Sequence, residues 1–244
     1  MILTIDLGNT NIVFGLFKGK KLIDVWRCRT SKLKIKNVKE RIDAVIICSV
    51  VPALNNKLKS LIRRQFGLAP AFVTARNIPG LKVRLKNKRE IGADRVVDAL
   101  AAYELYGGPA IIVDFGTATT LDLVSSRGEY LGGVIAPGVL LARDALYERA
   151  AKLPRITVKA PKKVLGRDTV SAMQSGLVHG YVSLIEGLVA RLKKEQGTRQ
   201  CLVVATGGLA GLICKHTDVI DRIDRHLTLK GLAMIGAEIK RAHD

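Results

Sequence analysis

Short apolar runs separated by polar turns shape the first half of the chain. Each run is brief, rich in branched residues and bounded by polar residues or glycine, which is typical of β-strands. In the longer segment 52–66, apolar residues recur at the spacing of a helix with one apolar face. The predicted strands are 1–5, 12–17, 44–51 and 71–74, with one more between 17 and 44; the predicted helices are 52–66 and 94–105, and 82–90 is predicted to be a charged loop.

The second half repeats this order after a Gly-Gly-Pro break. Gly176, Gly180 and Gly187 lie within one long helical pattern and predict close packing along it. The repeated order predicts a duplicated α/β fold, with one domain at 1–107, a second at 108–244 and a ligand-binding cleft between them. The predicted strands of this half are 110–113, 120–124, 129–136 and 201–205, and its predicted helices are 140–151, 169–194 and 229–242.

One short motif ends an apolar strand in each half. It reads Ile5-Asp6-Leu7-Gly8-Asn9-Thr10 in the first half and Val113-Asp114-Phe115-Gly116-Thr117-Ala118-Thr119 in the second. Glycine lets backbone N–H groups approach phosphate oxygens, and aspartate holds a cation or its water shell. The two turns together predict a protein that grips a nucleotide from both sides. Either turn alone has an ordinary hairpin turn as its alternative interpretation.

The composition allows a substantial core. Of 244 residues, 48% are hydrophobic, and no apolar run reaches the roughly 18 residues of a membrane span. Asp6 interrupts the first apolar run and no basic segment precedes it, which argues against a signal peptide and favours a cytoplasmic protein. Cys28, Cys48, Cys201 and Cys214 form no CxxC pair, so buried reduced thiols are expected rather than a zinc site.

The formal charge of +19 is the least expected bulk property. It is compatible with attraction of acidic metabolites, with nucleic-acid binding or with a solvated basic surface. Few aromatic residues accompany the positive charges to stack on bases, so nucleic-acid binding is unfavoured but stays open. The positive side chains cluster at 18–21, 32–41, 57–64, 82–89, 159–163 and 191–194.

Seven segments together resemble the type III pantothenate kinases, within the superfamily of acetate and sugar kinases, chaperone ATPases and actin. The resemblance implies duplicated ribonuclease-H-like (actin-like ATPase) domains with mixed sheets. It also implies ATP-dependent phosphorylation of pantothenate to 4′-phosphopantothenate, the first step of coenzyme A biosynthesis, by a homodimer that uses Mg²⁺ and a monovalent cation, K⁺ or NH₄⁺. The segments are DLGNTN at 6–11, GADR at 92–95, VDFGTATT at 113–120, YLGGVIAPG at 130–138, GRDT at 166–169, MQSG at 173–176 and ATGGL at 205–209.

The same resemblance implies the roles of individual residues. Asp6 would hold magnesium through water, and Asp114 matches the family's ligand for the monovalent cation. No GxxxxGK[ST] loop is present, so P-loop chemistry is not expected. The ATP-binding positions correspond to Asp6, Leu7, Gly8, Asn9, Thr10, Asn11, Ile12, Val13 and Thr117, and the substrate-binding positions to Gly92, Ala93, Asp94, Arg95 and Thr169.

Asp94 is the predicted general base. A primary alcohol does not ionise near neutral pH, so a carboxylate within reach must take its proton during attack. Asp94 also stands at a predicted helix start, where an aspartate is often a plain N-cap, and the resemblance favours the catalytic interpretation. Thr169 is expected to bond the pantothenate amide and has the same N-cap alternative. Arg95 is expected to hold a carboxylate or the transferred phosphate.

Three features depart from the family pattern, one of them being Asp168, where asparagine is common. Leu85 stands where the family usually has a tyrosine, and 30–43 is shorter and more basic than the helix usual there. Loss of the tyrosine hydroxyl bears on pantothenate affinity more than on ATP chemistry. Two alternative functions follow: a weakly active or inactive relative that acts as a nucleic-acid-binding regulator, and a kinase for another small alcohol or acid.

Overall fold

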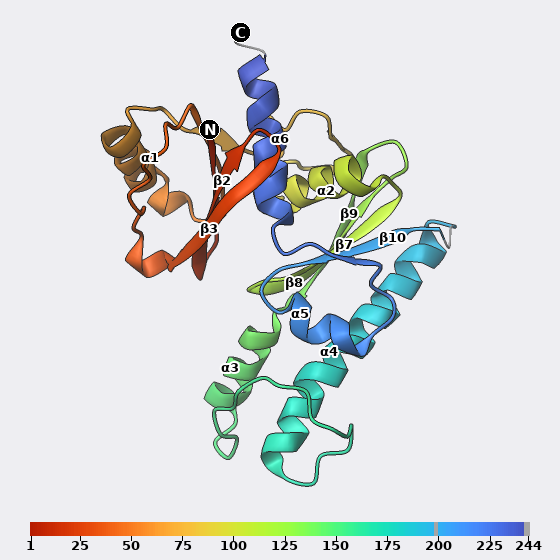
Figure 1. The fold of residues 1–244 in the computed structure, drawn as a ribbon. Coiled ribbons are helices and arrows are strands. Elements are labelled where there is room, and N and C mark those ends of the chain that lie inside the picture. The colour runs from red at the N-terminus through yellow and green to blue at the C-terminus, as the bar shows by residue number, and fades with distance from the viewer. Residues whose placement is uncertain (198–199, 242–244) are drawn as a thin grey trace. The chain divides into compact units, whose positions relative to one another are not determined.

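The computed structural model describes residues 1–197 and 200–241. The chain divides into two compact units and contains two β-sheets in its described part. The first unit consists of Met1–Leu105, Gly128–Leu131 and the described part of His226–Asp244, and the second of Tyr106–Arg127 and Gly132–Arg225 without 198–199. Figure 1 shows the course of the chain through both.

The first unit is built on a five-stranded mixed sheet. Strands β1, β2 and β3 form an antiparallel meander, and β4 and β5 continue from β1 in parallel, in the order β3-β2-β1-β4-β5. The pairing of β1 with β4 sets Asp6 opposite Cys48 at the end of both strands. The strands are β1 (Ile2–Leu7), β2 (Asn11–Lys18), β3 (Lys21–Arg29), β4 (Ala44–Ser49) and β5 (Ala71–Val73).

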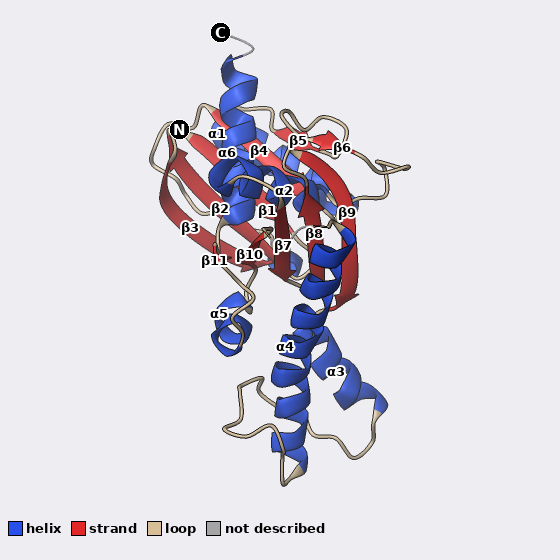
Figure 2. Ribbon diagram, turned by 90° about the vertical axis from the view of Figure 1, so that its right-hand side faces the viewer, coloured by secondary structure: helices blue, strands red, loops and turns tan. Residues whose placement is uncertain are grey.

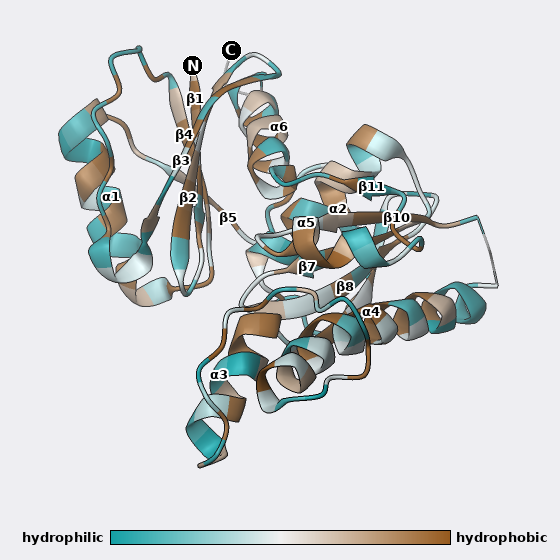
Figure 3. Cartoon of the chain, turned by 60° about the horizontal axis from the view of Figure 1, so that its bottom comes forward, coloured by the Kyte–Doolittle hydropathy of each residue, from teal (hydrophilic) through white to brown (hydrophobic). Residues whose placement is uncertain are grey.

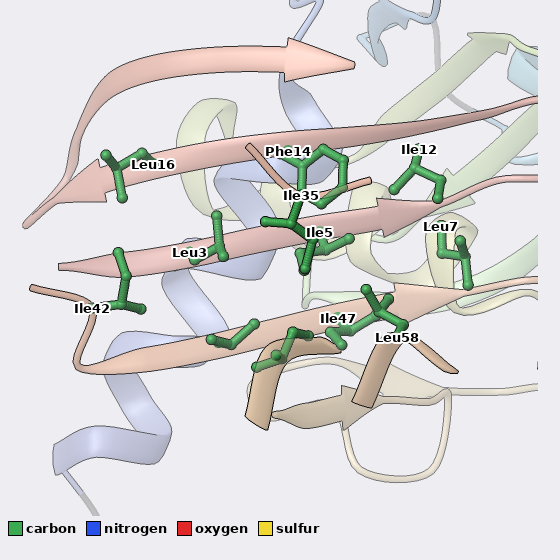
Figure 4. Packing of buried hydrophobic residues seen from close by; sticks show 12 residues of the cluster. Leu3, Ile5, Leu7, Ile12, Phe14, Leu16, Ile35, Ile42, Ile47 and Leu58 are labelled. Carbon is green, nitrogen blue, oxygen red and sulfur yellow. The ribbon is translucent and has the colours of Figure 1, made fainter. Parts of the chain in front are cut away.

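Alternation along these strands builds a core on each face of this sheet. Leu3, Ile5 and Leu7 of β1 point to one face, where they meet side chains of β2 and of helix α1 (Pro52–Phe66), as Figure 4 shows. Helix α6 (Leu227–Arg241) covers the opposite face (Figure 1), and its Gly236 packs so closely on Ile46 that an added Cβ would lie 2.7 Å from that side chain. The predicted helix 52–66 is confirmed.

Segment 30–43 crosses between β3 and β4 without a long helix. Only Thr30–Lys32 forms a short 3₁₀ turn, and buried Ile35 and Ile42 join the core under α1. Lys36 lies with its Nζ 4.1 Å from the centre of the Trp26 ring and pairs with Asp24. Two apolar anchors and one cation–π contact thus hold this segment.

The second sheet has six strands, in the order β11-β10-β7-β8-β9-β6. The predicted charged loop at 82–90 begins with a short strand instead, because Lys82 and Val83 pair with Glu129 and Tyr130. The sheet's strands are β6 (Lys82–Val83), β7 (Ala110–Phe115), β8 (Ala118–Val124), β9 (Glu129–Pro137), β10 (Leu202–Thr206) and β11 (Arg222–Ile223); the other helices are α2 (Ala93–Tyr106), α3 (Val139–Arg149), α4 (Thr169–Glu195) and α5 (Ala210–Ile213), with a 3₁₀ turn at Cys214–His216. Figure 2 shows these strands and helices by type.

Both sheets are mixed, which confirms the duplicated α/β, ribonuclease-H-like fold class. The domain bounds 1–107 and 108–244, and the cleft, stay predictions; residues 242–244 lie outside the described part of the chain. Helix α6 lies within the bounds predicted for the second domain, but it groups with the first unit. The close packing predicted at Gly176 and Gly180 is wrong for this chain alone, because a Cβ added at either would meet no atom within 4 Å.

Across residues 1–197 and 200–241, no helix combines the length and the apolar character that crossing a bilayer requires.

Candidate functional site

The turn after β1 is held by a residue that the sequence analysis did not single out. Gly8 N–H donates to the carbonyl of Asn11 at 3.1 Å, which closes the turn. Thr30 supports it from β3's end: its hydroxyl donates to the Gly8 carbonyl at 2.7 Å, and its N–H donates to the Thr10 carbonyl at 3.0 Å. The only sequence signal for Thr30 is a hydroxyl residue directly after a strand.

The predicted ATP-binding residues of the first unit occupy this one hairpin. Leu7 and Ile12 are fully buried in the core, so only their backbone groups can face a ligand. Asn9, Thr10 and Asn11 are exposed and can offer side-chain donors. The hairpin comprises Asp6 and Leu7 at the end of β1, Gly8, Asn9 and Thr10 in the turn, and Asn11, Ile12 and Val13 at the start of β2.

Asp6 supplies the carboxyl group of this hairpin, and the pKa of that group is raised. Burial, and then the negative charge of Asp94, raise its pKa to about 7, while a hydrogen bond from the Cys48 thiol to Asp6 Oδ1 at 3.4 Å lowers it. The fully buried Cys48 has its own pKa raised by burial and by these carboxylates, so it stays a neutral donor. A ligand that brings positive charge is therefore favoured beside Asp6, because it would stabilise the ionised carboxylate.

Asp94 lies in the first turn of α2, close enough to Asp6 for the two charges to interact. The helix begins at Ala93, so Asp94 lies within it rather than at the N-cap position. Its Oδ1 accepts the backbone N–H of Arg95 at 2.9 Å and lies 2.4 Å from where a Cβ on Gly92 would be, so a side chain at position 92 would displace this carboxylate. Burial raises the pKa of Asp94, while the Arg95 N–H and guanidinium lower it.

A pocket of about 400 Å³ opens beside Arg95 in the first unit. Leu85, at the position where a tyrosine was expected, is one of its walls, so this departure from the family pattern falls on a cavity. Arg95 supplies a cation, and Asn87 and Glu90 supply polar groups. The lining residues are Leu85, Lys86, Asn87, Glu90, Ile91 and Arg95.

In the second unit, Asp114 ends β7 beside two glycines. A Cβ on Gly207 would lie 2.3 Å from Asp114 Oδ1, and one on Gly116 would lie 3.1 Å from Oδ2. Gly207 also has a φ of 90°, which favours glycine. The predicted ATP contact Thr117 is exposed in the adjacent turn, and its carbonyl accepts the N–H of Gly138 at 3.1 Å. Backbone atoms thus crowd the Asp114 carboxylate without a bulky side chain in between.

Thr169 is the first residue of α4 and is exposed. The N-cap is the residue before it: Asp168 accepts the Ser171 N–H at 2.9 Å, and the Ser171 hydroxyl reaches back to the Asp168 backbone. The N-cap interpretation of Thr169 is therefore wrong by one residue, and its hydroxyl is not needed for that cap.

The donor set suits a weakly protein-bound magnesium ion. Within the described ranges, no three His, Cys, Asp or Glu residues are grouped to hold a metal. Magnesium commonly keeps several waters and binds one or two carboxylates together with substrate phosphates. Asp6 fits this pattern, because a cation nearby would offset both its burial and the repulsion from Asp94.

Comparison with known sequences identifies a family. A family model described as type III pantothenate kinase matches residues 2–191. A type III pantothenate kinase from Moorella thermoacetica is 46% identical over 251 residues, covering 96% of this chain and 98% of that protein. Another from Halalkalibacterium halodurans is 44% identical over 250 residues, with the same two coverages.

Solved structures share the fold at low sequence identity. A protein from Campylobacter jejuni assigned to the Baf family of transcriptional activators has a TM-score of 0.66, 19% identity and coverage of 98% of this chain and 99% of its own. A ROK hexokinase from Thermus thermophilus has a TM-score of 0.51 and 15% identity, with coverage of 98% and 99%. At these identities the similarity establishes the fold alone.

We expect Asp6→Asn to raise the melting temperature of the metal-free protein at pH 8. A carboxyl group whose pKa is raised on folding costs stability as pH rises from its unfolded pKa near 4 to its folded pKa of about 7, and the full cost applies above that. Removing about 1 kcal/mol of such cost shifts the melting temperature by about 2–4 °C in a chain of this size. At pH 4 most of the gain should vanish, because Asp6 is then protonated in the folded state and about half protonated in the unfolded state.

Differential scanning calorimetry in the presence of a chelator measures the effect. Asp218→Asn, which neutralises an exposed carboxylate, is the matched control and should change little at either pH. An equal gain at pH 4 and pH 8 would show that Asp6 is not the ionised group that destabilises the fold.

Proposed function

The chain belongs to the type III pantothenate kinase family, and on that basis we propose that it transfers the γ-phosphoryl group of ATP to the primary hydroxyl of pantothenate, the first step of coenzyme A biosynthesis. One observation within the molecule supports this most directly. Asp6 and Asp94 lie close enough to raise the pKa of Asp6, one beside a glycine turn and the other beside a pocket. The cytoplasmic location stays a prediction.

The turn Gly8–Thr10 is the proposed phosphate-binding element. Because Thr30 and Asn11 hold its backbone from within, its exposed groups are positioned before any ligand arrives. This preorganisation matters, since phosphoryl transfer asks a protein mainly for positioning and charge stabilisation. When bound, magnesium would neutralise developing charge on the phosphates, with Asp6 as its water-mediated partner.

Asp94 is the proposed general base. Its pKa is raised above the ordinary carboxyl value by burial, which brings it nearer to the pH at which it must accept a proton. The hydrogen bond from the Arg95 N–H orients Oδ1 and leaves the other carboxylate oxygen available to the substrate. Arg95 offers a bidentate partner for the pantothenate carboxylate, and Thr169 a hydroxyl for its amide.

Asp114 is the proposed ligand of a monovalent cation, K⁺ or NH₄⁺. Its carboxylate lies half-buried between the glycines at 116 and 207, so a cation bound there would act at short range on a partly desolvated charge. Asp122 lies two ladder positions away on the same strand pair, buried and hydrogen-bonded to Thr120. A monovalent cation would offset this local negative charge.

A homodimer is proposed from an apolar surface in the second unit. Large apolar side chains remain exposed along α3 and on the segment before α4: Leu141 is 51% exposed, Tyr147 49%, Val164 68% and Leu165 77%. Figure 3 shows the hydrophobic stretches of α3. An exposed apolar surface of this kind marks an interaction site, and a second copy of the chain is the partner that the family implies.

Incubation with Mg²⁺, ATP and pantothenate should yield phosphopantothenate, detected by mass. Asp94→Asn should lower kcat by about 10²-fold or more while ATP affinity is kept, because the proton acceptor is lost. Glu104→Gln, at an exposed position of the same helix, is the matched control and should keep full activity.

Full activity of Asp94→Asn would remove this residue from the base role. No turnover by the unmodified protein, combined with salt-sensitive DNA binding, would favour the nucleic-acid-binding regulator that the charge of +19 leaves open.

Asp114→Ala should abolish activation by K⁺ or NH₄⁺, because the cation loses its carboxylate. The measurement compares turnover in potassium or ammonium chloride with turnover in a salt of a bulky organic cation at equal ionic strength. Asp218→Ala, which removes an exposed carboxylate of the same unit, should keep the activation. Undiminished activation in Asp114→Ala would place the cation elsewhere.

Leu141→Glu combined with Leu165→Glu should convert a dimer to a monomer, because two buried charges would oppose the apolar contact. Size-exclusion chromatography with light scattering measures the mass. Ile23→Glu, at a 44% exposed apolar position of the first unit, is the control and should leave the dimer intact. A monomeric unmodified protein, or a dimer that survives the double substitution, would contradict this interface.

A further inference from the structure

A second pocket lies in the first unit and shares Glu90 and Ile91 with the Arg95 pocket. Its volume is about 560 Å³, within the range of small-molecule sites. It is bounded by the end of β4, the start of α1, the residues after β5 and the approach to α2. The lining residues are Ser49, Val50, Pro52, Val73, Thr74, Ala75, Arg76, Lys88, Arg89, Glu90, Ile91, Gly92 and Ala93.

Three cations line this pocket: Arg76, Lys88 and Arg89. None of them makes an ion pair with a carboxylate in the part of the chain that the structure describes. Glu90 is the only acidic residue of the lining, and its Oε1 accepts a hydrogen bond from Asn87. The pocket therefore carries a net positive charge that the protein itself does not neutralise.

The loops that carry these cations are internally ordered. Asn77 Oδ1 accepts the backbone N–H of Thr74 at 2.6 Å, and the Thr74 hydroxyl accepts the N–H of Arg76 at 3.3 Å. The N–H of Arg89 donates to Asn87 Oδ1 at 3.1 Å. Side chain-to-backbone bonds of this kind hold a turn in one conformation, so the cations extend from defined positions.

The inner wall is apolar. Val73, Ala75, Ile91 and Ala93 are all less than 10% exposed as residues, and they line the same cavity as the cations. A site with an apolar wall and an excess of positive charge suits a ligand that has both an uncharged body and an anionic group. An inorganic anion would use the cations and leave the wall unused.

We propose that this pocket is a second ligand site, which binds a small phosphomonoester. The phosphate group lies among Arg76, Lys88 and Arg89, and the organic body lies against Val73 and Ile91. Cations on convex surfaces, such as Lys57 and Arg63 on α1, are exposed but line neither of the two pockets. The arrangement at the second pocket therefore distinguishes it from the general positive charge of the chain.

The site also has a route to the proposed reaction. Glu90 and Ile91 line both this pocket and the Arg95 pocket. Gly92 and Ala93, two of the expected substrate-binding positions, line this pocket and lead directly into Asp94. A ligand that pulls on segment 88–93 thus shifts one wall of the Arg95 pocket. This regulatory effect rests on the proposed kinase function, whereas the binding itself does not.

Titration calorimetry with butyl phosphate and with inorganic phosphate tests the binding. The protein is first saturated with magnesium and a non-hydrolysable ATP analogue, so that phosphate binding at the ATP turn does not contribute. Butyl phosphate should bind about 10-fold more tightly than inorganic phosphate, because its chain buries apolar surface against the wall. Equal affinities, or no binding, would overturn the proposal.

The double variant Arg76→Gln, Lys88→Gln should weaken butyl phosphate binding by about 10-fold or more. Lys57→Gln, Arg63→Gln removes the same charge from α1 and should leave binding unchanged. An equal loss of binding in both variants would show that net charge alone accounts for the affinity, and it would overturn the proposed site. Tripolyphosphate that binds more tightly than butyl phosphate would also overturn it, since charge alone would then decide affinity.

Two further measurements separate this proposal from the kinase assignment. Asp94→Asn should bind butyl phosphate as the unmodified protein does, even though it lacks turnover; loss of binding there would place the ligand at the catalytic site. In the active enzyme, butyl phosphate should change the KM for pantothenate more than kcat, and this change should vanish in Arg76→Gln, Lys88→Gln. A change that persists in that variant would contradict the regulatory route.

Discussion

The structure depends on an electrostatic conflict at the end of β1. Asp6 is opposed in its ionised form by burial and by the charge of Asp94, and one thiol hydrogen bond from Cys48 compensates little of this. A fold that keeps two such carboxylates near each other gains from a bound cation or from a proton. The family's chemistry supplies a cation, the divalent metal that accompanies ATP.

Glycines let the backbone approach these carboxylates closely. Gly92 leaves room for Asp94 Oδ1, and Gly207 leaves room for Asp114, where any Cβ would overlap the carboxylate. Asp94 in the first turn of α2 and Asp114 in β7 thus each have a glycine packed against the carboxylate.

The positively charged side chains of the chain lie in two different settings. On α1 and on 30–43 the positive side chains are exposed, while Ile35 and Ile42 beneath them are anchored in the core. Around Arg76 and Lys88 the same excess lines a pocket with an apolar wall. The Arg95 pocket, which Leu85 lines, shares Glu90 and Ile91 with this pocket.

The sequence by itself determined the strands, the main helices and the identity of the repeated aspartate turns, because hydrophobic period and glycine placement are local properties. It did not reveal Thr30 or Cys48, since both act through contacts between strands far apart in the chain. The short strand β6 depended on pairing with Glu129 and Tyr130. Only tertiary structure decided these, because burial, cross-strand contacts and pKa shifts depend on which distant residues become neighbours.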